Sequence, residues 1–382
     1  MAKNEGHKRR RLVYFVTEDW YFCSHRLQLA VAAKNAGFDV YVVTRVQAHG
    51  DEIKTAGLEL IPLELSRRSK NPFVEAVMVR RLTKIYREIR PDIVHHVAIK
   101  PVIYGSIAAR RAHVPVVINA MAGLGFLFSS GQWLARVLRP IIRVVFKVLL
   151  NNKRTTVILQ NPDDVDALCG SGTVSRNRIR LILGSGVDTD VYHFQPEAEG
   201  VPIVLLASRL LWDKGVGEFV EAARKIRADG VNVRFVIAGE GDDENPNSIG
   251  ADQLLKWSEE GVVECWGRCS NMPEVFVKSH VVCLPTTYGE GVPKVLIEAA
   301  SSGRPIVATD APGCREIVND GENGILVPTK DIDALVAAIT YLLESSERRK
   351  AMGQAGRKLV EAQFSLDRVI GETLELYRTA QE

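Results

Sequence analysis

Short runs of apolar, β-branched residues recur along the whole chain, with helix-like segments between them. These runs lack the clean alternation of a half-exposed strand, which is typical of parallel strands that are buried on both faces. Seven runs lie in the first half of the chain, at residues 11–18, 38–44, 58–65, 92–98, 115–120, 155–160 and 179–186. Six more follow, at residues 203–208, 233–240, 262–267, 281–286, 305–310 and 324–329. The pattern predicts an α/β protein with two Rossmann-like, doubly wound domains.

An acidic stretch that contains proline and glycine separates the two series of runs. It predicts a linker, because domain boundaries tend to fall in such segments. We therefore expect one Rossmann-like domain over residues 1–186, a linker over 187–201 and a second Rossmann-like domain over 202–365. A last helix over 366–382 is expected to cross back to the first domain. Doubly wound sheets bind ligands at the carboxyl ends of their strands, so the chemistry should lie in the loops there, at a central cleft faced by both domains.

The composition is that of a globular protein without disulfides or membrane spans. Of the 382 residues, 46% are hydrophobic and 25% are charged. No apolar run reaches the roughly 18 residues that cross a bilayer. The cysteines are scattered and form no CxxC pair, which favours reduced thiols in the cytoplasm and argues against a zinc site. They are Cys23, Cys169, Cys265, Cys269, Cys283 and Cys314.

Charge divides unevenly between the two halves, although the net charge is only +3. Residues 1–188 contain 29 Lys and Arg against 15 Asp and Glu, a balance of +14, while the remainder has a balance of −11. No acidic residue lies between Asp92 and Asp163, and nine basic residues do. The asymmetry suggests that the first half meets an anionic surface or ligand. A solvated basic face without a partner is the alternative.

The segment 131–154 reads as a basic amphipathic helix. Its cations follow steps of three, four and four residues, which places them on one helical stripe among apolar residues; they are Arg136, Arg139, Arg143 and Lys147. Such a helix can lie in the interface of a bilayer, with its cations near anionic headgroups. A core-packed helix with a basic outer face is the alternative. Pro140 is expected to kink or divide it.

Two cations follow the first strand of the second domain. Arg209 and Lys214 lie five residues apart in "SRLLWDKG" (208–215), at a strand end and in the loop after it. A guanidinium and an ammonium there can converge on one phosphate group. Two solvated surface cations are the alternative. The chain has no Walker loop here and no GxGxxG after its first strand, which disfavours an oxidoreductase that binds a dinucleotide.

A glycine-rich turn with two carboxylates follows a later strand. In "YGEGVPKVLIEAASSG" (288–303), Glu290 lies in the turn and Glu298 lies in the helix that begins beyond it. Glycine lets the backbone approach a ligand closely, and a helix N-terminus suits a phosphate. Two carboxylates at different depths suit a ligand with two sets of hydroxyls, such as a sugar and a ribose. For Glu298 alone, an ordinary helical salt bridge would be the simpler interpretation.

This combination resembles the retaining glycosyltransferases of family 4. The motifs that carry the resemblance are E-x7-E after a "GEGVP" turn, R-x4-K after an earlier strand, "GVDTDVYHF" (186–194), "GRCSNMPEVF" (267–276) and "GENGILVP" (321–328). The resemblance covers nearly the whole chain. It implies the two-domain GT-B fold, a nucleotide sugar bound on the second domain, and catalysis without a metal or other cofactor.

The resemblance also implies roles for individual residues. Arg209 and Lys214 would neutralise the leaving diphosphate, and Glu298 would hold the ribose. Glu290 would hold the transferred sugar, helped by the backbone N–H groups of Gly291 and Val292. Residues expected to line the rest of the nucleotide site are Gly239 and Arg268. Residues expected on the acceptor side are His25, Arg26, Lys100 and Gly123.

Further stretches, among them 66–73, 99–109, 122–128 and 242–249, narrow the resemblance to transferases that extend sugars on polyprenyl diphosphates. Within that group the chain resembles the PglA-type transferases, which move N-acetylgalactosamine from a UDP-sugar to an undecaprenyl-diphosphate-linked sugar. We expect a bacterial hexosyltransferase in glycoprotein, capsule or O-antigen assembly, peripheral on the cytoplasmic face of the membrane and without a nucleic-acid partner. The alternatives are a nucleotide-sugar epimerase of the same fold, a transferase with a soluble acceptor, and a regulatory protein that binds a nucleotide without catalysis.

Overall fold

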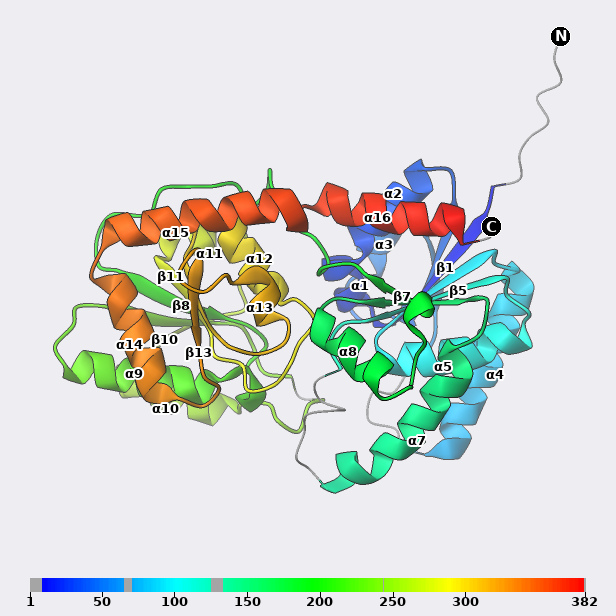
Figure 1. Ribbon diagram of the computed structural model, residues 1–382, viewed down its shortest axis with the longest axis horizontal. Coiled ribbons are helices and arrows are strands. Elements are labelled where there is room, and N and C mark those ends of the chain that lie inside the picture. Colours follow the sequence, from blue (N-terminus) through cyan, green and yellow to red (C-terminus); the bar gives the residue numbers. More distant parts are fainter. Residues whose placement is uncertain (1–8, 65–70, 125–132, 243, 381–382) are drawn as a thin grey trace, which may run out of the picture. The chain divides into compact units, whose positions relative to one another are not determined.

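All thirteen predicted apolar runs contain a strand in the computed structural model of the protein (Figure 1). The structure describes residues 9–64, 71–124, 133–242 and 244–380, without the side chains of residues 72 and 133–138. The strands form two parallel sheets, and each sheet carries helices between its strands. Each sheet with its helices forms a Rossmann-like domain, as the sequence predicted.

Two structural units divide the described residues. The first unit holds the chain up to Ala122, the segment from helix α7 to Ile182, and the residues from Ile370 onward. The second holds Leu183–Val369, together with Gly123 and Leu124. The chain therefore returns to the first unit within its last helix, α16 (Leu366–Thr379).

The sheet of the first unit has the strand order β3-β2-β1-β4-β5-β6-β7 within the described residues. Its strands are β1 (Arg11–Glu18), β2 (Asp39–Arg45), β3 (Glu59–Pro62), β4 (Ile93–Val97), β5 (Val116–Met121), β6 (Thr155–Leu159) and β7 (Ile179–Leu181). All five residues of β4 and all six of β5 are buried. Burial on both faces explains why these strands read as continuous apolar runs.

The helices of this unit fall into two groups by the direction of the crossovers that they make. The chain moves one way along the sheet from β1 to β3 and the other way from β3 to β7. Because crossovers between parallel strands are right-handed, the two groups cover opposite faces. One group is α1 (Asp19–His25), α2 (Leu27–Asn35) and α3 (Gly50–Thr55). The other is α4 (Pro72–Ile89), α5 (Ile99–Arg111), α7 (Trp133–Leu150) and α8 (Pro162–Gly170).

Helix α16 is anchored to the first unit by a buried polar cluster. The hydroxyl of Tyr377 is hydrogen-bonded to the hydroxyl of Tyr14 on β1 (2.7 Å) and to Nδ1 of His95 on β4 (2.6 Å). All three side chains are almost fully buried. Burial lowers the pKa of His95 well below its usual value, with Arg26 acting in the same direction, so the imidazole is neutral. The last helix thus completes a core built by the first strands.

The sheet of the second unit has the order β10-β9-β8-β11-β12-β13 within the described residues. Its strands are β8 (Ile203–Ala207), β9 (Arg234–Ala238), β10 (Glu264–Gly267), β11 (Val281–Leu284), β12 (Ile306–Thr309) and β13 (Gly324–Val327). The helices are α9 (Val216–Ala228), α10 (Ala251–Glu259), α11 (Met272–Lys278), α12 (Lys294–Ser301), α13 (Cys314–Ile317), α14 (Ile332–Leu343) and α15 (Ser346–Leu359). Short helical turns are η2 (Trp212–Lys214) and η3 (Val360–Phe364) in this unit, and η1 (Arg176–Arg178) in the first unit.

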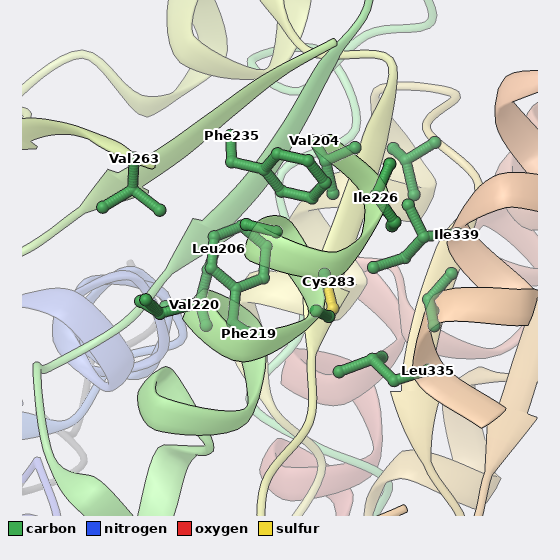
Figure 2. Packing of buried hydrophobic residues seen from close by; sticks show 14 of the residues in the cluster. Val204, Leu206, Phe219, Val220, Ile226, Phe235, Val263, Cys283, Leu335 and Ile339 are labelled. Atoms are coloured by element: carbon green, nitrogen blue, oxygen red, sulfur yellow. The ribbon is translucent and has the colours of Figure 1, made fainter. Parts of the chain in front are cut away.

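Large side chains fill the core on one side of this second sheet (Figure 2). Phe219 of α9 packs edge-on against Phe235 of β9, with ring centroids 5.5 Å apart. Val204 and Leu206 of β8 belong to the same buried cluster. Truncating a buried aromatic of this kind costs about 3–5 kcal/mol. The strands that carry the candidate site loops are therefore rigidly supported.

Helix α7 is continuous through Pro140, where the sequence suggested a kink or a break. Pro140 is exposed, and the helix buries Phe146 and Leu150 beyond it. Within the ranges that the structure describes, no helix is long and apolar enough to cross a bilayer.

Candidate functional site

The predicted residues of the second unit gather at one edge of its sheet. Arg209 and Lys214 follow β8, Gly239 follows β9, Arg268 follows β10, and Glu290 follows β11. The carboxyl ends of parallel strands share one edge, so these loops are neighbours. Strands β8 and β11 pair directly, while the chain leaves β8 toward β9 on the other side. The site therefore lies at a topological switch point, where doubly wound sheets bind their ligands.

The loop after β8 is tied to the loop after β11. The carbonyl of Asp213 accepts hydrogen bonds from the backbone N–H of Thr287 (2.9 Å) and from the hydroxyl of Thr286 (3.1 Å). Gly215 ends η2 with a φ of +75°, and a Cβ there would lie 1.9 Å from the carbonyl oxygen of Pro285. Only glycine fits this position. The tight junction fixes Lys214 beside the glycine-rich turn.

Lys214 and Glu290 form an ion pair inside the site. Their side chains are only 11% and 13% exposed, and the ammonium lies 5.6 Å from the centroid of the Tyr288 ring. Burial lowers the pKa of Lys214, but Glu290 and Tyr288 raise that pKa by more, so it lies above its usual value. The ammonium is therefore charged at neutral pH, and it is poised next to a carboxylate.

Arg209 pairs with Asp242, which follows β9, at 3.0 Å. A hydrogen bond of 2.8 Å between the Asp242 backbone N–H and the Ser248 hydroxyl holds the aspartate loop. Arg209 is half-exposed, whereas its partner is mostly buried. Both candidate cations thus have carboxylate partners in this conformation. An anionic ligand would compete with those carboxylates.

Glu298 lies in the second turn of α12 and is 7% exposed. It forms a salt bridge of 3.2 Å with Lys294 one turn earlier and accepts a hydrogen bond from the Tyr192 hydroxyl. Burial raises the pKa of Glu298, and both partners oppose that shift. The helical salt bridge that the sequence allowed is present. The carboxylate is held in place and remains able to accept further hydrogen bonds.

The glycine-rich turn is supported from two sides. The N–H of Glu290 donates to the carbonyl of Pro312 (3.0 Å), and helix α12 begins at Lys294, immediately beyond Val292 and Pro293. Gly123, which groups with the second unit, has a φ of +85°, and a Cβ there would lie 2.7 Å from the backbone nitrogen of Gly291. Gly123 is therefore a site of close backbone approach to the turn.

Gly239 and Arg268 complete the loops at this edge. The N–H of Gly239 donates to the carbonyl of Gly267 (2.7 Å), which joins the end of β9 to the end of β10. Arg268 follows Gly267 and is exposed. The backbone beside Arg268 is thus held by the loop that follows β9.

The other predicted acceptor residues lie in the first unit, each in a different setting. His25 stacks on Tyr21, with ring centroids 4.2 Å apart. Arg26 is buried between α1 and α2. Lys100, at the start of α5, pairs with Glu75 of α4 at 2.8 Å. Lys100 therefore takes part in an ion pair that joins α5 to α4.

The predicted membrane cations all lie in α7. Arg143 and Lys147 are exposed, and Arg139 is half-buried. The side chain of Arg136 lies outside the described part of the structure.

Three residues of the site were not predicted: Tyr288, Tyr192 and Asp242. Tyr288 faces the Lys214 ammonium, Tyr192 bonds Glu298, and Asp242 pairs with Arg209. Tyr288 lies in the glycine-rich stretch 288–303, and Tyr192 lies in the motif 186–194. Their position within those stretches is the signal that could have revealed them.

Two family descriptions match most of the chain. Residues 188–359 match the Glycosyl transferases group 1 family, and residues 11–161 match the Glycosyl transferase 4-like family. The first match contains every candidate residue from Arg209 to Glu298.

Similar proteins carry related activities. The chain is 28% identical over 337 residues to the N,N'-diacetylbacillosaminyl-diphospho-undecaprenol alpha-1,3-N-acetylgalactosaminyltransferase of Campylobacter jejuni, covering 85% of this chain and 87% of that one. It is 23% identical to the capsular polysaccharide biosynthesis glycosyltransferase CapM of Staphylococcus aureus, covering 97% and 98%. Among solved structures, Anabaena HepE in complex with UDP and glucose matches with a TM-score of 0.79 and 15% identity, covering 97% of this chain and 100% of that one.

Proposed function

Because the chain is a glycosyltransferase of the GT-B fold, with a glycosyl transferase 4-like domain followed by a glycosyl transferases group 1 domain, we propose that its donor is a UDP-sugar and its acceptor a saccharide on a polyprenyl diphosphate. The transferred sugar is N-acetylgalactosamine, and the anomeric configuration is retained. The enzyme acts in the assembly of a bacterial glycan, as a glycoprotein, capsule or O-antigen transferase.

The observation that carries the proposal is the meeting of Lys214 and Glu290 at the switch point of the second sheet. One buried position thus offers a cation for a leaving phosphate and a carboxylate for sugar hydroxyls. Breaking the bond between sugar and diphosphate develops negative charge on the phosphate oxygens. Preorganised cations aimed at that charge are the largest expected contribution to catalysis.

Each part of the donor has a proposed partner. Arg209 and Lys214 bind the diphosphate, and Glu290 holds the sugar hydroxyls. Glu298 accepts hydrogen bonds from the ribose. Further contacts come from the backbone N–H groups of Gly291 and Val292 at the sugar, and from the backbone around Arg268 and Gly239 at the base.

The reaction needs no dedicated side-chain base in this scheme. The acceptor hydroxyl attacks the anomeric carbon on the face from which the diphosphate leaves. A phosphate oxygen of the leaving group takes the proton of that hydroxyl. Arg209 and Lys214 supply the positive charge that the departing diphosphate requires, so we propose that turnover is independent of a metal ion.

The acceptor assignment rests on similarity. The name of the Campylobacter jejuni relative describes a bacillosaminyl-diphospho-undecaprenol acceptor, and the HepE complex holds UDP. We propose His25, Arg26, Lys100 and Gly123 for the acceptor side. A polyprenyl-linked acceptor lies in a membrane, so we place the enzyme on the cytoplasmic face of the cell membrane as a peripheral protein.

The test is to incubate the purified enzyme with a panel of UDP-sugars and a polyprenyl-diphosphate-linked saccharide, and to follow the lipid by mass spectrometry. We expect one added N-acetylhexosamine, and a loss of addition in the Lys214→Met variant. An epimerised UDP-sugar without addition would instead indicate an epimerase. Transfer to a soluble saccharide alone would overturn the acceptor assignment. Binding of UDP without any turnover would indicate a regulatory protein.

A further inference from the structure

Three of the helices on one face of the first unit, α4, α5 and α7, lie next to one another, and the two that flank α5 carry unusual outer surfaces. Helix α5 is the middle helix of the three and packs against both others, exposing little beyond its last two residues. Helices α4 and α7 therefore form two ridges, one on each side of α5. The three helices can be followed in Figure 1.

Exposed apolar side chains concentrate on these two ridges. Within the described residues, fourteen large apolar side chains are exposed, and six of them lie on α4 and α7. They are Phe73, Val74 and Val77 on α4, and Ile141, Val144 and Val148 on α7. Exposed single apolar residues are common, but a cluster of this kind marks an interaction site.

The outer side of α7 presents an apolar stripe with a cationic border. Ile141, Val144 and Val148 are 58%, 63% and 58% exposed, and their spacing of three and four residues puts them on one side of the helix. The exposed cations Arg143 and Lys147 flank that stripe, one turn apart. Phe146, on the inner side, is fully buried. The helix is therefore apolar on two sides, of which only one faces the core.

The outer side of α4 also carries exposed apolar residues and exposed cations, one group after the other along the helix. Its first turns expose Phe73 (81%), Val74 (50%) and Val77 (44%). The following turns expose a row of cations, which is Arg80, Arg81, Lys84 and Arg87. Glu88 lies at the far end of this row, 3.8 Å from Lys84. The apolar end of α4 would contact the apolar interior of a bilayer, and the row of cations would contact its headgroups.

The stripe on α7 ends at a basic cavity. Val148 and Leu149 line a cavity of about 300 Å³, whose other walls include Arg110, His113 and Arg154. A pocket lined by arginines beside an apolar stripe suits a phosphate that is attached to acyl chains.

We propose that the outer faces of α4 and α7 are the docking surface of the enzyme for an anionic lipid bilayer. The proposal rests on the proposed function, since the polyprenyl-linked acceptor would be delivered from that bilayer. The charge of residues 93–162 favours an anionic bilayer over a protein as the partner. No acidic residue lies between Asp92 and Asp163, so the α5–α7 region offers only positive charge. Apolar side chains bordered by cations are the pattern of helices that lie in a lipid interface.

The test compares matched variants in vesicle sedimentation. The apolar variant carries Ile141→Ser, Val144→Ser and Val148→Ser, and the cation variant carries Arg143→Gln and Lys147→Gln. A second apolar variant carries Phe73→Ser and Val74→Ser. The matched control is Leu255→Ser on α10 of the second unit, where the native side chain is also 58% exposed. The probes are vesicles of phosphatidylcholine alone and of phosphatidylcholine with phosphatidylglycerol, at low and high salt.

We expect the wild type and the Leu255→Ser control to bind vesicles with phosphatidylglycerol, and to bind less at high salt. The cation variant should bind about 25-fold more weakly, because each cation contributes about fivefold near an anionic surface. Both apolar variants should lose at least about tenfold on every vesicle, since buried methyl groups drive insertion.

UDP affinity, measured by calorimetry, should be unchanged in every variant and serves as the control for folding. Equal vesicle binding by the wild type and the apolar variants would overturn the proposal. So would a concentration-dependent dimer that the apolar variants abolish, which would make this face an interface between copies of the chain. Vesicle binding without any glycosyl transfer would refute the proposed function and leave the docking surface standing. Transfer to a short-chain acceptor without vesicle binding would refute the docking surface and leave the proposed function standing.

Discussion

Replacing Glu290 by Gln should strengthen the binding of UDP and weaken sugar transfer. In the structure the Lys214 ammonium is already paired with the Glu290 carboxylate inside the site. A diphosphate that uses Lys214 must compete with that carboxylate. The Gln side chain keeps nearly the same shape and removes the competing charge. The sugar, which UDP lacks, loses a charged partner in the variant.

The size of the effect follows from the burial of the pair. Two unit charges about 3 Å apart attract by roughly 5 kcal/mol at an effective dielectric constant of about 20. The cost of removing the charges from water offsets most of this, which leaves about 1–3 kcal/mol for a mostly buried pair. UDP should therefore bind about 5- to 150-fold more tightly to Glu290→Gln. Transfer should fall about 10- to 150-fold, the cost of one charged hydrogen bond.

Calorimetry with UDP and turnover at saturating donor separate the two effects. Lys214→Met is the control, and it should lose both UDP affinity and turnover. Thermal unfolding gives a third measurement, because Glu290→Gln leaves a buried ammonium without its carboxylate and should unfold at a lower temperature. The raised pKa of Lys214 means that the pair stabilises the fold fully below about pH 10.4 and that this stabilisation is lost at higher pH. The difference in stability between wild type and variant should therefore shrink above about pH 10.

Weaker binding of UDP to Glu290→Gln would refute this reasoning, because it would place the carboxylate among the groups that hold the nucleotide. Unchanged affinity together with unchanged transfer would remove Glu290 from the site altogether.

The remaining predictions concern Glu298, Arg209, metal dependence and His96. Glu298→Gln should reduce UDP affinity about tenfold in calorimetry, from the lost charged acceptor. The same variant should be more stable at neutral pH, because burial raises the pKa of Glu298, and this gain should disappear as the pH falls toward the ordinary glutamate pKa of about 4.3. Arg209→Ala should lower turnover about 10- to 150-fold, and Arg209→Lys should lower it less; near-normal turnover in the alanine variant would contradict the role at the diphosphate. Turnover should survive a chelator, and activity that EDTA abolishes and magnesium restores would contradict the metal-independent scheme. Burial lowers the pKa of His96 to about 4, opposed by its bond to Asn119, so denaturant titrations should show about 3 kcal/mol of stability lost between about pH 6.5 and 4. A variant with His96→Gln should show a shallower loss.

The fold was largely predictable because parallel strands buried on both faces must be apolar along their whole length. Each predicted run contains a strand, although several runs extend past the strand into the loop that follows. The run at 179–186 is an example, since β7 ends at Leu181 and apolar residues continue to Leu183. The continuity of α7 through Pro140 was not predictable from local preference.

The candidate site was predictable in part. Arg209, Lys214, Glu290 and Glu298 stand at fixed spacings within quoted motifs, and the topology brings their loops together. Their partners could not be read from spacing, because Asp242 meets Arg209 only through the pairing of different strands. The spacing of apolar residues also did not predict which face of α7 is exposed. Ile141 and Phe146 are both apolar residues of one helix, and only the packing of the unit decides that the first is exposed and the second is buried.

The hydrogen bonds of Tyr377 have a consequence for the order in which the protein is made. The core that Tyr14 and His95 help to build is closed by a side chain that is synthesised roughly 200 residues after the rest of the first unit. At about 5–20 residues per second, a ribosome needs on the order of 10–40 s to deliver it. During that time the buried hydroxyl of Tyr14 and the ring of His95 lack the partner that they have in the finished protein. The first unit is therefore synthesised early but completed late, because its buried polar cluster forms only when the last helix has been made.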